Sequence, residues 1–166
     1  KRALELAREA VGLSNPNPPA GAVVVKNGRI VGEGHTLPPG EAHAEVIALR
    51  QAGEQAKGAT LYTTLEPCCH FGKTPPCTRD IIQAGITQVH MCIIDPNPLV
   101  NGKGRAELEH AGINIYLEDG NQEADEIAEA YIKFVTTGYP FVVAKFAMSL
   151  DGKIATSSGD SKWITS

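Results

Sequence analysis

The sequence predicts an α/β fold of three layers, in which helices cover both faces of a mixed sheet of about five strands. One observation is a pair of β-branched runs, residues 20–26 and 29–34, joined by Asn27-Gly28, a dipeptide typical of the tight turn between antiparallel strands. The other is the alternation of strand and helix patterns after Gly40, which is typical of parallel strands joined by helices. The sheet is therefore expected to begin antiparallel and to continue parallel.

The individual elements follow from their hydrophobic spacing. Residues 1–13 carry apolar side chains at helical intervals, and Gly12 offers a stop. The later elements are identified in the same way, with helices at residues 43–52, 78–84, 105–111 and 123–137 and strands at residues 60–65, 89–94 and 113–117. A new pattern begins at Gly138-Tyr139-Pro140, and a further strand is expected at residues 141–146.

Composition narrows the class of protein. The chain has 166 residues, the usual length of one domain, and its 42% hydrophobic and 20% charged residues are enough for a packed core rather than a disordered chain. A net charge of -4 without a basic stripe argues against a nucleic-acid partner. Because no apolar run reaches the roughly 20 residues of a membrane span, we expect a cytoplasmic protein. Its four cysteines are then metal-bound, catalytic or buried rather than disulfide-linked.

Two segments carry residues suited to metal chemistry. The first is His43-Ala44-Glu45 at a helix start, and the second is residues 66–77, which hold Cys68 and Cys77. One imidazole and two thiolates are the protein ligands of a catalytic zinc that keeps its fourth position for water. Zinc deaminases carry H-x-E followed by P-C-x-x-C. Here the two cysteines are separated by a longer excursion, and both thiolates and the histidine are expected at helix starts, which favour anions.

Glu45 is predicted to be the general acid and base rather than a ligand. Residues at i and i+2 do not share a helix face, so His43 and Glu45 must both lie at the entry turn of the helix. A bound zinc lowers the pKa of its water to ~7, and Glu45 would move protons from that water to the substrate.

Interpretations without catalysis also stay open. A structural zinc would close with a fourth protein ligand, for which Cys69 or His70 is available. The loops at residues 15–19 and 95–98 are turns by composition, although the second follows a parallel strand, where ligands gather in such sheets.

The motifs together resemble one family, the bifunctional riboflavin-biosynthesis enzymes that join a diaminohydroxyphosphoribosylaminopyrimidine deaminase to a 5-amino-6-(5-phosphoribosylamino)uracil reductase. The matching motifs are Pro16-Asn17-Pro18, Gly21-Ala22-Val23-Val24-Val25, His43-Ala44-Glu45, Leu65-Glu66-Pro67-Cys68, Thr74-Pro75-Pro76-Cys77, Asp95-Pro96-Asn97-Pro98 and Ser149-Leu150-Asp151-Gly152-Lys153. The resemblance covers nearly the whole chain and implies a cytidine-deaminase-like fold. One departure is Thr36, which stands where many relatives have a histidine, one position after His35.

The resemblance also implies residue roles. Zinc would be held by His43, Cys68 and Cys77, with Glu45 as the proton shuttle. The substrate pocket would be lined by Asn17, His70, Lys73, Asp95 and Asn97. Lys73 could meet the substrate phosphate as a point charge. The family further suggests homo-oligomers.

Two domains are implied in the same way. Residues 1–138 would form the zinc-dependent deaminase domain, and residues 139–166 the beginning of an incomplete reductase domain that uses NADPH. In that second part, Lys145 and Ser161 would touch the reductase substrate, and Ala147 and Trp163 the nicotinamide cofactor. Because most of that domain is absent, the chain alone is expected not to carry out the reduction.

The sequence thus predicts a hydrolase that deaminates 2,5-diamino-6-(5-phosphoribosylamino)pyrimidin-4-one, a small phosphorylated pyrimidine. Two alternatives remain: a deaminase of nucleosides or of tRNA, and a catalytically silent module that zinc only stabilises.

Overall fold

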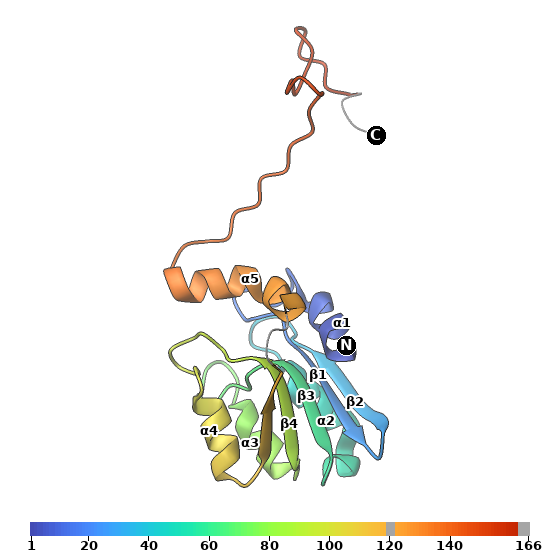
Figure 1. The fold of residues 1–166 in the computed structure, drawn as a ribbon, viewed down its shortest axis with the longest axis vertical. Helices are drawn as coiled ribbons and strands as arrows, with labels where there is room; N and C mark the ends of the chain where they lie inside the picture. Colours follow the sequence, from blue (N-terminus) through green and yellow to red (C-terminus); the bar gives the residue numbers. More distant parts are fainter. Residues whose placement is uncertain (119–121, 163–166) are drawn as a thin grey trace.

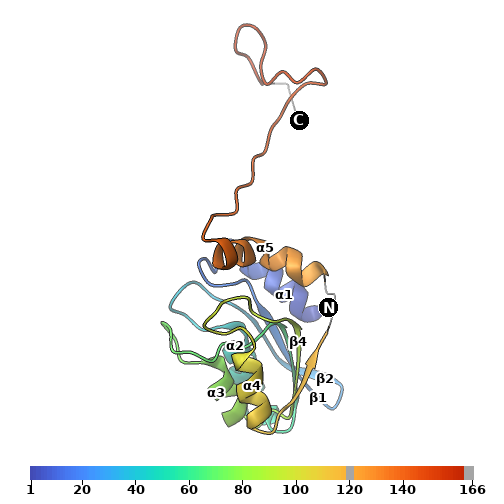
Figure 2. The ribbon, with the colours of Figure 1, turned by 60° about the vertical axis from the view of Figure 1, so that its left-hand side comes forward.

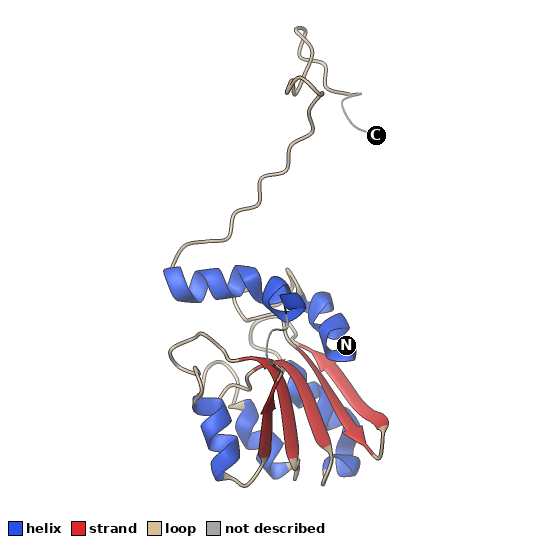
Figure 3. Cartoon of the chain, in the orientation of Figure 1, coloured by secondary structure: helices blue, strands red, loops and turns tan. Residues whose placement is uncertain are grey.

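A computed structural model describes residues 1–118 and 122–162. Its five-stranded sheet has the order β2-β1-β3-β4-β5 (Figure 3). The strands are β1 (Gly21–Lys26), β2 (Arg29–His35), β3 (Thr60–Leu65), β4 (Gln88–Ile93) and β5 (Asn114–Leu117). β1 pairs antiparallel with both β2 and β3, whereas β3, β4 and β5 run parallel. The mixed sheet predicted from the sequence is confirmed.

The β1–β2 hairpin forms as its turn residues predict. Asn27 and Gly28 both have positive φ, 52° and 73°, which a primed turn between twisted strands requires. The paired strands then send alternate side chains to opposite faces of the sheet. On β1, Val23 packs with Ala3 and Leu6 of the first helix, while Val24 belongs to the main core on the other face.

Helices cover both faces of this sheet (Figures 1 and 2). The helices are α1 (Arg2–Ala10), α2 (Ala44–Ala52), α3 (Cys77–Gln83), α4 (Lys103–His110) and α5 (Gln122–Thr137), with a short 3-10 turn η1 (Gly53–Ala56) after α2. Fully buried Leu61, Ile81 and Leu108 join β3, α3 and α4 in the main core. α1 packs on the opposite face, and α5 lies beside it, linked by an Arg8–Glu123 ion pair at 2.9 Å. No helix in the described ranges is long and apolar enough to cross a membrane.

The segment after Gly138 differs from this body. Its described part, residues 139–162, extends away from the sheet and helices (Figure 1). The strand expected at residues 141–146 is wrong for this chain, because that stretch has neither helix nor strand. A strand needs a neighbour to satisfy its backbone hydrogen bonds. Here Val142 and Val143 are each 76% exposed, so nothing packs against them.

Candidate metal centre and its cavity

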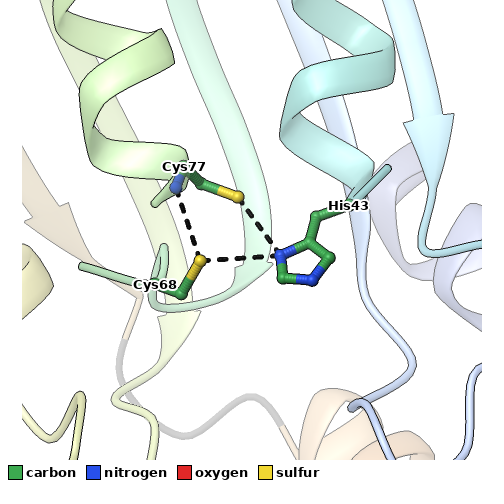
Figure 4. A group of neighbouring side chains, drawn as sticks. All are labelled: His43, Cys68 and Cys77. Carbon is green, nitrogen blue, oxygen red and sulfur yellow. Dashed lines mark hydrogen bonds between the residues drawn. The ribbon is translucent and has the colours of Figure 1, made fainter. Parts of the chain in front are cut away.

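His43, Cys68 and Cys77 converge from three separate places in the chain (Figure 4). His43 is the N-cap residue of α2, and Cys77 is the first residue of α3. Cys68 lies in the loop after β3 rather than at a helix start, yet its sulfur accepts the backbone N–H of Cys77 at 3.4 Å. Both thiols and the imidazole therefore meet at helix N-termini, where the helix dipole favours negative charge.

The donor set fits a zinc ion. His43 Nδ1 lies 3.5 Å from Cys68 Sγ and 3.3 Å from Cys77 Sγ. In a tetrahedral zinc site with bonds of about 2.3 Å to sulfur and about 2.0–2.1 Å to nitrogen, sulfur and nitrogen stand about 3.6 Å apart. Among the described residues, the group that could hold a metal contains these three side chains only, which matches the three protein ligands of an open site.

The two cysteine sulfurs at the site also favour binding of a cation. The thiol and backbone N–H of Cys77 stabilise the Cys68 thiolate and lower its pKa, with a further contribution from His43. The pKa of Cys77 is raised because its sulfur shares a proton with Cys68 and is buried beside other anions. Two thiolates this close repel each other, and a dication removes that repulsion, since metal binding displaces the thiol protons.

The other nitrogen of His43 has its own partner. Nε2 lies 3.4 Å from the Thr74 hydroxyl, in the loop between the two cysteines. A histidine that ligates a metal through one nitrogen normally hydrogen-bonds through the other, which fixes its ring. Thr74 therefore explains part of the long spacing between Cys68 and Cys77.

Glu45 stands beside the three ligands on the first turn of α2 and is only 5% exposed. Burial, and then the negative charge of Cys68, raise its pKa to about 7. A carboxyl group with a pKa near neutrality is suited to both accept and donate a proton.

The remaining candidate residues surround a cavity of about 260 Å³ that opens over the centre. His43, Glu45 and Cys68 line it, and so do all five residues expected in the substrate pocket: Asn17, His70, Lys73, Asp95 and Asn97. The Nδ1 atom of His70 is buried without a hydrogen-bond partner among the described residues. Such atoms are rare in folded proteins, and a bound molecule would supply the partner.

Other sequence candidates lie elsewhere. Cys69 points its sulfur toward the Leu99 carbonyl at 3.8 Å and is outside the metal group. Thr36 lines the cavity, whereas His35 faces away, with Nδ1 3.5 Å from a Glu9 oxygen. The three described reductase candidates, Lys145, Ala147 and Ser161, are exposed in the extended segment, and Trp163 lies outside the described residues.

Two residues of this region were missed by sequence reasoning. Glu66 is 2% exposed, and its carboxylate accepts the backbone N–H groups of Asp95, Gly102 and Arg105 at 2.8–3.2 Å. It thereby ties the end of β3 to the Asp95 loop and to the start of α4. Gly104 allows this approach, because a Cβ there would lie 2.1 Å from the Pro67 carbonyl oxygen. The second is Tyr131 on α5, which lines the cavity and contacts Asp95. The sequence offers no signal for the role of Glu66 beyond its place before Pro67, and none for Tyr131 beyond helical periodicity.

Comparison with known proteins defines the class. Residues 1–93 match the family described as the cytidine and deoxycytidylate deaminase zinc-binding region, and residues 140–166 match the RibD C-terminal domain. Because the first match covers more than half of the chain and the metal ligands fit, the chain belongs to the zinc-binding cytidine and deoxycytidylate deaminase family.

Within that class, the similarity to RibD proteins runs along the whole chain. The chain is 54% identical to the riboflavin biosynthesis protein RibD of Aquifex aeolicus over 166 residues, covering 100% of this chain and 47% of that protein. It is 49% identical to RibD of Escherichia coli over 165 residues, covering 99% of this chain and 45% of that protein. The crystal structure of a diaminohydroxyphosphoribosylaminopyrimidine deaminase/5-amino-6-(5-phosphoribosylamino)uracil reductase from Thermotoga maritima superposes with a TM-score of 0.92 at 48% identity, covering 99% of this chain and 48% of that one. The chain thus spans slightly less than half the length of these relatives, and the resemblance seen in its motifs is confirmed.

Proposed function

We propose that the chain catalyses the hydrolytic deamination of 2,5-diamino-6-(5-phosphoribosylamino)pyrimidin-4-one, as the front half of a bifunctional deaminase–reductase. Water replaces the amino group, giving ammonia and 5-amino-6-(5-phosphoribosylamino)uracil. The observation that carries the proposal is the convergence of His43, Cys68 and Cys77 beside a buried Glu45 at the floor of one cavity. The similarity to RibD proteins supports the choice of substrate.

In this reaction His43, Cys68 and Cys77 hold the zinc. When bound, zinc supplies a Lewis acid that makes water nucleophilic at neutral pH. Glu45 takes a proton from the attacking water on a carboxylate oxygen and delivers it to the ring nitrogen. It then takes the proton of the newly added hydroxyl group and passes it to the amino group, so that the C–N bond breaks and ammonia leaves. Its buried position beside His43 and the two cysteines suits both steps.

The cavity supplies substrate recognition. Asn17, Asp95 and Asn97 offer amide and carboxylate groups for the donors and acceptors of a pyrimidine ring. His70 lines the same cavity and can contact the ligand with its ring. Lys73 is exposed at the cavity and can meet the ribosyl phosphate.

The rest of the assignment follows from the same likeness. Residues 1–138 would be the deaminase domain and residues 139–166 the start of an NADPH-dependent reductase, in which Lys145 and Ser161 meet the substrate and Ala147 and Trp163 the cofactor. We expect a cytoplasmic homo-oligomer that binds a small phosphorylated pyrimidine.

The test is ammonia release from this substrate by the zinc-loaded chain, with a Glu45→Gln variant and a chelator. Loss of the proton shuttle should lower kcat by about 10²–10⁴-fold while zinc stays bound, because Glu45 is not a ligand. Glu54→Gln, an exposed glutamate outside the cavity, serves as the control and should match wild type.

Two results would contradict the proposal. Release of ammonia from cytidine or a tRNA loop, with indifference to the ribosyl phosphate, would indicate a nucleoside or tRNA deaminase. A chain that unfolds on zinc removal, yet turns nothing over and tolerates Glu45→Gln, would be a module that zinc only stabilises.

A further inference from the structure

Tyr131 reaches into the cavity from α5, on the side facing the Asp95 loop. Its side chain is 9% exposed, and its ring belongs to the main core. Its hydroxyl lies 2.9 Å from Oδ1 and 3.1 Å from Oδ2 of Asp95, so one proton is shared between both carboxylate oxygens. The ring thus serves the core, whereas the hydroxyl serves a carboxylate that lines the substrate cavity.

The hydrogen bond from Tyr131 fixes the orientation of the Asp95 carboxylate. Oδ1 also accepts the backbone N–H of Asn97 at 2.8 Å, so Oδ1 carries the greater share of the internal donors. The remaining lone pairs, chiefly those of Oδ2, are available to an N–H or O–H group in the cavity. A substrate that carries exocyclic amino groups and a ring N–H offers such donors.

The backbone of Asp95 is held independently of Tyr131. Its N–H donates to Glu66 Oε2 at 3.2 Å, and Glu66 is anchored by two further backbone donors. Removal of the Tyr131 hydroxyl therefore leaves the loop backbone in place and frees the two side chains that contact the hydroxyl, Asp95 and Asn97. Because Asp95 is 4% exposed and lines the cavity, a lost donor could be replaced only from the cavity side.

We propose that Tyr131 is a positioning residue for the deaminase reaction, whose hydroxyl orients the Asp95 carboxylate to receive a donor group of the pyrimidine substrate. This inference rests on the proposed function. With this role for Tyr131, α5, the helix that leads into the reductase segment, also contributes a residue to the deaminase site.

The experiment compares steady-state kinetics of zinc-loaded wild type, Tyr131→Phe and Tyr116→Phe. Phenylalanine keeps the ring in the core and removes only the hydroxyl. Tyr116 on β5 is 45% exposed and outside the cavity, which makes it a matched control. We expect Tyr131→Phe to raise KM about tenfold, the effect of one hydrogen bond to a charged group. kcat should change far less, and zinc content should be unaffected.

A second pair of variants links the effect to Asp95. If the hydroxyl acts through that carboxylate, Tyr131→Phe should raise KM much less in an Asp95→Asn background than in wild type. Dissociation constants for the uracil product should follow the same pattern and do not depend on turnover.

The outcomes separate this inference from the proposed function. If wild type deaminates the substrate but Tyr131→Phe only melts at a lower temperature, with KM unchanged, the residue is structural and the inference is wrong. A fall in kcat alone, or an equal effect in the Asp95→Asn background, also overturns it. If wild type itself releases no ammonia from this substrate, the proposed function falls, and the positioning role falls with it.

Discussion

The metal wall of the cavity, formed by His43, Glu45 and Cys68, differs from the α5 wall, formed by Tyr131, Phe134 and Val135. The metal wall presents ionisable groups at the start of α2 and in the loop after β3, where Cys68 contacts the backbone N–H of Cys77 and the ring of His43. The α5 wall presents aromatic and aliphatic side chains from a single helix, with one hydroxyl directed at Asp95. Under the proposed function, the metal wall carries out the reaction and the α5 wall helps to hold the substrate. Substitutions of the metal ligands should therefore abolish the reaction, whereas those in the α5 wall should have smaller, graded effects.

The largest effect is expected for Cys77→Ser. Loss of one of three protein ligands should reduce bound zinc from about one ion per chain to nearly none and abolish deamination, because an alcohol is a poor zinc ligand at neutral pH. Elemental analysis of the purified chain measures it. Cys69→Ser is the matched control and should keep its zinc, since Cys69 lies outside the metal group. Loss of zinc in Cys69→Ser instead would indicate a closed structural site.

A smaller effect on the metal centre is expected for Thr74→Val, which keeps the β-branched shape and removes the hydroxyl beside His43 Nε2. Zinc affinity should weaken by roughly 10–100-fold, as is usual when the partner of a ligating histidine is lost. Competition with a chromogenic chelator gives the affinity. Thr136→Val, exposed near the end of α5, should bind zinc as wild type does. Equal zinc affinities in Thr74→Val and Thr136→Val would show that Thr74 does not support His43 as a ligand.

At the mouth between the two walls, Lys73→Met should raise KM for the phosphorylated substrate by about two- to fivefold, the usual scale of an exposed charge pair. The effect should shrink as salt is added, because exposed charges are screened. The dephosphorylated substrate serves as the internal control and should be handled equally by wild type and variant. A KM increase that is the same for both substrates would assign Lys73 a role other than phosphate binding.

The smallest effect is expected for deletion of residues 139–166. None of the described residues 139–162 lines the cavity, and this part of the chain extends away from the sheet and helices (Figure 2). Zinc content, kcat and KM of the deaminase reaction should stay at their full-length values. A loss of deaminase activity on deletion would show that the segment contributes to one of the walls.

The two walls also differ in how far sequence could predict them. The residues of the metal wall could be predicted because they belong to short sequence motifs. A histidine and a glutamate at one helix start lie close together in any fold, and so do two cysteines on either side of one loop. The hairpin at Asn27-Gly28 was predictable for the same reason: its backbone demands are local. Only Cys68 was misplaced, since it reaches the start of α3 from a loop.

The α5 wall depends on packing between distant segments. Ala124, Ala128 and Tyr131 recur at helical spacing and indicate a buried face, and nothing in that spacing distinguishes a core tyrosine from one that also reaches a cavity. Glu66 was likewise visible only once the loops after β3 and β4 lay side by side. The strand expected at residues 141–146 failed for a related reason: a strand pattern does not form a strand without a neighbour.

Anomalous diffraction at the zinc edge from crystals of the zinc-loaded chain tests the metal wall most directly. The account predicts one ion bonded to His43 Nδ1, Cys68 Sγ and Cys77 Sγ at about 2.0–2.3 Å, with its fourth position facing the cavity next to Glu45. An ion closed by Cys69, His70 or any other fourth side chain, or three ligand atoms that hold no ion, would contradict it.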